Sequence, residues 1–138
     1  MTKIKSIMLI DDNEVDRFIN QKVIESLNFI ESILPFGSAR DALNYLKLIE
    51  DMNSYHGVFP PQIILLDINM PVMDGFAFID EFGKLEISKQ NHVTIFMLSS
   101  SSNPEDIKKA NNNKYVSGLI VKPLTTAKLI ERLYTKRK

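Results

Sequence analysis

The stretch ILLDINMPVMDG (residues 64–75) contains an apolar run that ends abruptly in polar residues. Residues 63–66 are all Ile or Leu, without the polar alternation of a half-exposed strand, which predicts a strand buried on both faces. Asp67 ends this run, and the NMPVMDG that follows holds the Asn, Pro, Asp and Gly residues typical of turns. The stretch therefore predicts a buried strand that carries a carboxylate at its carboxyl end.

Similar apolar runs recur along the chain, and segments with helical periodicity separate them. The other predicted strands lie at residues 7–10, 30–36, 93–98 and 118–121, and Pro35 within the second of them suits an edge position. The helical segments are marked by apolar residues at Val15, Phe18, Ile19, Val23 and Leu27, by Ser38 to Leu46, by Phe78 to Phe82, by Asn103–Pro104 and by Ala127 to Tyr134. Five strand–helix repeats predict a doubly wound α/β fold, a flavodoxin-like (βα)5 three-layer sandwich with parallel strand order 2-1-3-4-5.

The composition sets limits on the class of protein. With 138 residues we expect one domain, and 17 basic residues balance 17 acidic ones, so no net charge favours nucleic acid or an anionic membrane as partner. No apolar run approaches the length of a membrane helix, and the first one ends in two aspartates instead of a signal-peptide cleavage site. The absence of cysteine fits a reducing compartment. We therefore expect a cytoplasmic protein.

Polar residues follow four of the predicted strands where each strand ends. They are Asp11 and Asp12, Asp67, Ser99 and Lys122. Each has a simpler explanation when taken alone, because Asp and Ser commonly cap helices or open turns. In an open α/β sheet, however, the carboxyl ends of the strands meet at one edge, where ligands bind. Three carboxylates at one edge repel one another, so together they predict a bound cation.

The ion that these residues favour is Mg²⁺. The chain has no cysteine, and its two histidines, His56 and His92, lie in predicted loops, which argues against zinc or copper. Mg²⁺ suits a site with carboxylates, a carbonyl, water and a phosphoryl oxygen. Carboxylates, Mg²⁺ and a lysine together favour phosphoryl transfer to a carboxylate.

Four motifs of this chain resemble the receiver domain of bacterial two-component response regulators, of the stand-alone, CheY-like type. They are MLIDDNEVDR, ILLDINMPVMDG, FMLSSSSNPEDIKKA and GLIVKP, and they occur in the family's order over almost the whole chain. The resemblance implies a phosphoprotein of a two-component phosphorelay. It implies that Asp67 accepts a phosphoryl group from a histidine kinase or phosphotransfer protein as an aspartyl phosphate.

The resemblance also implies roles for the neighbouring residues. Asp12, Asp67 and the backbone carbonyl of Asn69 would bind Mg²⁺ directly, and Asp11 would act mainly through a coordinated water. Lys122 would pair with the phosphoryl oxygens, and Ser99 would hydrogen-bond to one of them after transfer. A cis peptide bond before Pro123 is a further family trait.

The chain departs from the family pattern near the predicted switch. Leu119 stands where the family often has an aromatic residue that swings inward, and Ser100 stands where Ala is usual. We therefore expect signalling to rely on Ser99 and residues 99–103, with a smaller rearrangement than an aromatic side chain would give.

Two other functions compete with this interpretation. A Mg²⁺-dependent phosphohydrolase of the haloacid-dehalogenase type would need a second Asp two residues after the nucleophile, where this chain has Asn69. A degenerate receiver that acts only as a binding module would lack acids or the lysine, and none is missing.

We expect residues 1–138 to be a single receiver domain without an output domain. The protein would then be no enzyme beyond catalysing its own phosphorylation and dephosphorylation, and its signal would leave by protein contact with an unidentified downstream partner. The surface for that contact would be formed by the helix after Asn103, the strand at 118–121 and the last helix. The protein would be a monomer or a homodimer through that surface.

Overall fold

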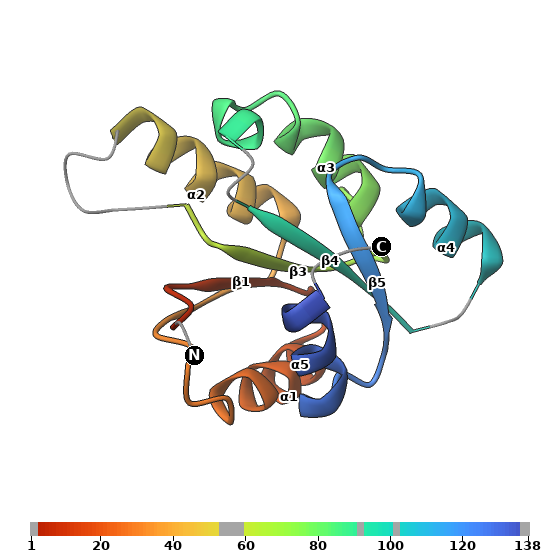
Figure 1. The fold of residues 1–138 in the computed structure, drawn as a ribbon. Helices are drawn as coiled ribbons and strands as arrows, with labels where there is room; N and C mark the ends of the chain where they lie inside the picture. Colours follow the sequence, from red (N-terminus) through yellow and green to blue (C-terminus); the bar gives the residue numbers. More distant parts are fainter. Residues whose placement is uncertain (1–2, 53–59, 91–92, 101–102, 136–138) are drawn as a thin grey trace.

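Five parallel strands form one sheet in the order β2-β1-β3-β4-β5, which confirms the predicted topology (Figure 1). The structure is a computed structural model, and it describes residues 3–52, 60–90, 93–100 and 103–135. The strands are β1 (Ile7–Ile10), β2 (Ile33–Phe36), β3 (Ile63–Asp67), β4 (Thr94–Ser99) and β5 (Val116–Val121). The helices are α1 (Glu14–Glu25), α2 (Ala39–Met52), α3 (Gly75–Phe82), α4 (Pro104–Asn111) and α5 (Thr126–Thr135). The short 3-10 helix η2 (Glu86–Gln90), between α3 and β4, has no counterpart among the predicted elements.

Successive residues of the central strands pack into two separate cores. In β1, Met8 and Ile10 face one side of the sheet, while Ile7 and Leu9 face the other. The helices α2, α3 and α4 cover the first side, and α1 and α5 cover the second (Figure 1). Because both faces are covered, the central strands can be apolar at every position, which is why their sequences show runs instead of alternation.

The edge strand β2 is shorter than its predicted counterpart. Residues 30–36 were expected to form it, and only Ile33–Phe36 do, with a single bridge between Ile4 and Ile30 ahead of them. Pro35 lies in this edge strand, where a missing N–H donor leaves no gap inside the sheet.

Side-chain caps set the starts of the helices. The Asn103 side chain accepts a hydrogen bond from the Glu105 N–H, and Asp74 caps α3 in the same way through Ala77. Asn13, and neither of the preceding aspartates, is the cap of α1. The two aspartates are therefore not needed as helix caps.

One face of α1 differs from the expected one. The exposed fractions of Val15, Phe18 and Ile19 are 66%, 61% and 48%, so these apolar residues do not face the sheet. The buried residues of the helix are Asn20 and Ile24. The other two members of the predicted apolar stripe, Val23 and Leu27, pack in the core as expected. The reason lies at the start of the helix, where polar side chains bond to groups at the end of the sheet.

Some predicted features lie outside the described residues. They are His56, His92 and residues 101–102 of the segment 99–103 on which signalling was expected to rely. Within the part of the chain that the structure describes, no helix combines the length and apolar character needed to cross a membrane.

Candidate functional site

Asp67 is the last residue of β3 and is buried. The turn after it is held by two backbone hydrogen bonds, from the Ile68 N–H to the Leu98 carbonyl at 3.0 Å and from the Gly75 N–H to the Ile68 carbonyl at 2.8 Å. A β-carbon on Gly75 would lie 2.7 Å from the Asp67 carbonyl oxygen, closer than real β-carbons approach. Gly75 is thus required for space, because the start of α3 passes directly over the backbone that carries Asp67.

The same turn contains a strained residue that the sequence did not indicate. Val72 has a φ of 69°, in the left-handed region that β-branched residues avoid, and its side chain is fully exposed. Such conformations occur where the surrounding structure enforces them, often at functional sites.

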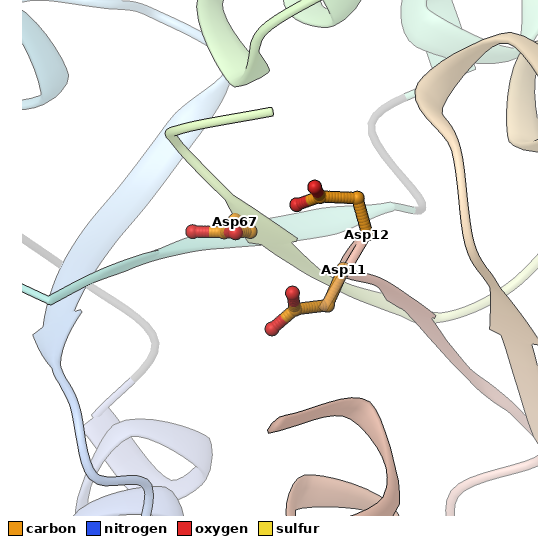
Figure 2. Close-up of side chains that lie close together, drawn as sticks. All are labelled: Asp11, Asp12 and Asp67. Carbon is orange, nitrogen blue, oxygen red and sulfur yellow. The ribbon is translucent and has the colours of Figure 1, made fainter. Parts of the chain in front are cut away.

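Asp11 and Asp12 directly follow β1 and complete an acidic cluster with Asp67. One carboxylate oxygen from each of the three lies within 4.8 Å of the others. Figure 2 shows the three side chains close together at the ends of β1 and β3. Asp11 and Asp67 are buried, whereas Asp12 is exposed, so the cluster opens to solvent on the Asp12 side.

Asp11 is held by the start of α1. Its Oδ1 accepts a hydrogen bond from the Asn13 N–H at 3.0 Å, and its carbonyl oxygen accepts one from Arg17 Nη1 at 2.8 Å. Asn13 in turn accepts from the Asp16 N–H at 2.9 Å. The first turn of α1 therefore presents polar side chains to the end of the sheet.

Lys122 reaches the acidic cluster from the end of β5. Its Nζ donates to Asp11 Oδ2 at 3.0 Å and to Asp16 Oδ2 at 3.2 Å, and lies 3.6 Å from Asp67 Oδ1. Its backbone N–H donates to the Ser99 carbonyl at 2.7 Å. The peptide bond to Pro123 is cis, as the resemblance implied.

Ser99, the last residue of β4, is buried beside the cluster. Leu98 pairs with Asp67 in the register of the sheet, so Ser99 lies one residue beyond the level of Asp67. Asn69, two residues after Asp67, is exposed, and its backbone acts to lower the pKa of the Asp67 carboxyl. Leu119 is buried in the core on the side of α3 and α4.

The electrostatics of the site favour binding of a cation. Burial, followed by repulsion from Asp11, raises the pKa of Asp67 from 3.8 to about 6, although Lys122 and the Asn69 backbone oppose this shift. Burial alone would lower the pKa of Lys122, but its hydrogen bond to Asp11 and the charges of Asp67 and Asp11 outweigh burial and raise it. One ammonium thus offsets only part of the acidic charge.

The structure brings together the predicted residues Asp11, Asp12, Asp67 and Lys122, with Ser99 and Asn69 adjoining them. It adds Asp16 and Arg17, which the sequence did not single out. The only sequence signal for them was their place in the first turn of the helix after the acidic pair, which did not show what their side chains contact.

Comparison with known proteins identifies the family. The sequence profile of the response regulator receiver domain matches residues 7–134. The chain belongs to this family. It is therefore a receiver domain of two-component signalling, a family of signalling modules that generally bind Mg²⁺ at an acidic pocket.

Similar proteins support this assignment over most of the chain. A two-component response regulator from Cytophaga hutchinsonii is 32% identical, with 97% of each chain covered and a TM-score of 0.85. A response regulator receiver protein from Dyadobacter fermentans is 28% identical, with 96% of this chain and 97% of that chain covered and a TM-score of 0.80. Response regulator Rcp1 of Synechocystis is 26% identical over 107 residues, which span 75% of this chain and 67% of the relative.

The donor set of this receiver domain fits Mg²⁺. Carboxylate oxygens are the ligands that this ion prefers, and within the described residues three of them converge here with no histidine or thiol in the group. The exposed position of Asp12 leaves access for the water molecules that Mg²⁺ retains.

Proposed function

We propose that Asp67 accepts a phosphoryl group from the phosphohistidine of a histidine kinase or phosphotransfer protein, in a reaction that depends on Mg²⁺. The observation that carries this proposal is the position of the Asp67 carboxylate, within 4.8 Å of the Asp11 and Asp12 oxygens and 3.6 Å from the Lys122 ammonium. A nucleophile, a cation site and a fixed positive charge thus lie within one small volume, as phosphoryl transfer requires.

In this reaction a carboxylate oxygen of Asp67 forms a bond to phosphorus while the bond from phosphorus to the donor's histidine nitrogen breaks. Asp12, Asp67 and the Asn69 carbonyl would hold Mg²⁺, with Asp11 acting through a coordinated water. The ion supplies positive charge for the phosphoryl oxygens. Asp67 remains in place because its strand is buried and hydrogen-bonded on both sides.

The proposed roles of Lys122 and Ser99 follow from their positions. The Lys122 ammonium would contact a phosphoryl oxygen on Asp67, since it already lies 3.6 Å from the carboxylate. Ser99, at the end of the neighbouring strand, would donate its hydroxyl to another phosphoryl oxygen after transfer. That movement, with little change at Leu119, would alter residues 99–103 and bias the domain between two conformations.

The exposed face of α1 is a suitable docking surface for the phosphodonor. Val15, Phe18 and Ile19 are exposed on the helix that also carries Asp16, a contact of Lys122. Clustered exposed apolar residues mark interaction sites. A donor protein that covers them would bring its phosphohistidine to the open side of the acidic cluster.

Downstream signalling is proposed to use the surface of α4, β5 and α5, by contact with another protein or with a second copy of this chain. Pairing through the edge of β5 is disfavoured, because Arg132 donates to the Leu119 carbonyl and Lys128 to the Val121 carbonyl. We place this signalling in the cytoplasm. The domain would pass its signal on by protein contact, and the only reactions that it would catalyse are its own phosphorylation and dephosphorylation.

The proposal is tested by intact mass spectrometry after incubation with Mg²⁺ and acetyl phosphate as a small phosphodonor. We expect one phosphoryl group on the wild type, and none when EDTA removes the metal or in Asp67→Asn. Asp80→Asn, an exposed aspartate of α3, should be phosphorylated like the wild type. Steady hydrolysis of many phosphate esters would instead support a phosphohydrolase, and binding of partners without any phosphorylation would support a degenerate receiver.

A further inference from the structure

Asp16 contacts the proposed phosphoryl-binding lysine but belongs to none of the roles assigned so far. Its Oδ2 lies 3.2 Å from Lys122 Nζ, closer than the 3.6 Å between that ammonium and Asp67. Asp11, Asp16 and Asp67 are the carboxylates within 4.0 Å of this ammonium among the described residues. An ammonium has three N–H donors, so these three carboxylates match its whole donor capacity.

The local structure of α1 leaves the Asp16 carboxylate available for this contact. An acidic residue three positions after a helix cap usually turns back to the N–H of the capping residue. Here that N–H, on Asn13, already donates to Asp11 Oδ1. The Asp16 side chain is directed to Lys122 instead, while its own N–H donates to the Asn13 side chain.

We propose that Asp16 is a positioning residue that holds the Lys122 ammonium on the α1 side of the site while Asp67 is unphosphorylated, and that this contact opposes the phosphorylated state. The inference rests on the proposed function of Asp67 and Lys122. When a phosphoryl group occupies Asp67, its oxygens compete with Asp16 for the same ammonium. The negative charge of Asp16 also repels the anionic phosphoryl group.

Removing Asp16 also removes one anchor of the Lys122 side chain, which by itself would weaken binding of a phosphoryl group. This effect is smaller than the gain from removing the competition and repulsion by Asp16. The Lys122 side chain is only 13% exposed and keeps its 3.0 Å contact with the buried Asp11 carboxylate, so it stays ordered without Asp16. Asp16 is 43% exposed, which places its contact with Lys122 in the range of solvent-screened ion pairs. Removing it should therefore change the affinity of a phosphoryl mimic by about two- to fivefold.

The test is calorimetric titration of beryllofluoride, a phosphoryl mimic, into the protein at saturating Mg²⁺. We expect Asp16→Asn to bind beryllofluoride about two- to fivefold more tightly than the wild type. Glu14→Gln is the matched control, because it removes the same charge from the same exposed first turn of α1 without removing a contact to Lys122. Its affinity should stay closer to the wild-type value.

Each alternative outcome has its own meaning. An affinity of Asp16→Asn for beryllofluoride that is equal to or lower than that of the wild type would overturn the inference. A gain in affinity in Glu14→Gln as large as that in Asp16→Asn would also overturn it, because it would show a general effect of charge. A wild type that never binds beryllofluoride in Mg²⁺ would overturn the proposed function itself and this inference with it. Urea unfolding of each variant, and Asp16→Ala as a second substitution, separate a change at the site from a loss of folding.

Discussion

Replacement of Asp67 by Asn should stabilise the metal-free protein at neutral pH. The pKa of Asp67 is about 6 in the folded protein, whereas the ordinary value of 3.8 applies to the unfolded chain. Each difference of one pKa corresponds to about 1.4 kcal/mol, so the ionised carboxylate lowers the free energy of unfolding by about 3 kcal/mol. The asparagine side chain has nearly the same shape and does not ionise.

The sign of the effect fixes its pH dependence. Because the pKa of Asp67 is raised on folding, its contribution to stability is fully present below pH 3.8 and is lost as the pH rises through about 6. The free energy of unfolding of Asp67→Asn should therefore differ little from that of the wild type at pH 4, and its advantage should grow as the pH rises to about 6. Above pH 7 the variant should be more stable by about 3 kcal/mol.

Urea denaturation in EDTA at several pH values between 4 and 8 measures this difference. Asp80→Asn, at an exposed position, serves as the control. Its free energy of unfolding should depend on pH in the same way as that of the wild type. Saturating Mg²⁺ should reduce the advantage of Asp67→Asn, because the ion binds the ionised carboxylate and stabilises the folded wild type. A difference that does not change with pH, or that grows as the pH falls, would refute the idea that burial and Asp11 raise the pKa of Asp67.

Four further substitutions test other parts of the structure by the same urea measurement. Gly75→Ala should lower the free energy of unfolding by about 1–3 kcal/mol, because the added β-carbon would collide with the Asp67 carbonyl oxygen. An unchanged stability would show that the start of α3 can move away from the end of β3. Phe18→Ser should change the free energy of unfolding by no more than about 0.5 kcal/mol, because Phe18 is exposed. Ile24→Ala, on the buried face of α1, should lower it by about 2–5 kcal/mol. A larger loss in Phe18→Ser than in Ile24→Ala would mean that the helix packs on its other face. Val72→Asn should stabilise by about 1 kcal/mol, since asparagine tolerates positive φ far better than valine, and a loss of stability would mean that the valine side chain makes a needed contact.

The fold was predictable from the sequence because its central strands are buried on both faces. Runs such as residues 63–66 have no polar position, and this identified both the strands and the parallel sheet. The alternation of strands and helices predicted a doubly wound sheet, and the order 2-1-3-4-5 was chosen as the flavodoxin-like arrangement of such a sheet. The edge strand β2 was less well predicted, since residues 33–36 are only partly buried and their pattern is correspondingly weak.

The residues at the strand ends were predictable for the same reason. A strand that is identified by its apolar run also identifies the residue that follows it, and this placed Asp11, Asp67, Ser99 and Lys122 at one edge of the sheet. Asp16 lies on a helix instead. Its contact with Lys122 depends on how far α1 is rotated about its axis, which the strands do not determine.

The rotation of α1 also explains why hydrophobic periodicity failed in the first turns of this helix. Arg17 bonds to the Asp11 carbonyl and Asp16 bonds to Lys122, so the side of the first turns that faces the end of the sheet is polar. Apolar residues in the same turns, such as Phe18, must then lie on other faces and become exposed. A periodicity argument assumes that burial is decided by apolar packing alone. Beside a polar site that assumption breaks down, so the apolar residues in the first turns of the adjoining helix are exposed, while Val23 and Leu27 farther along the chain still pack in the core.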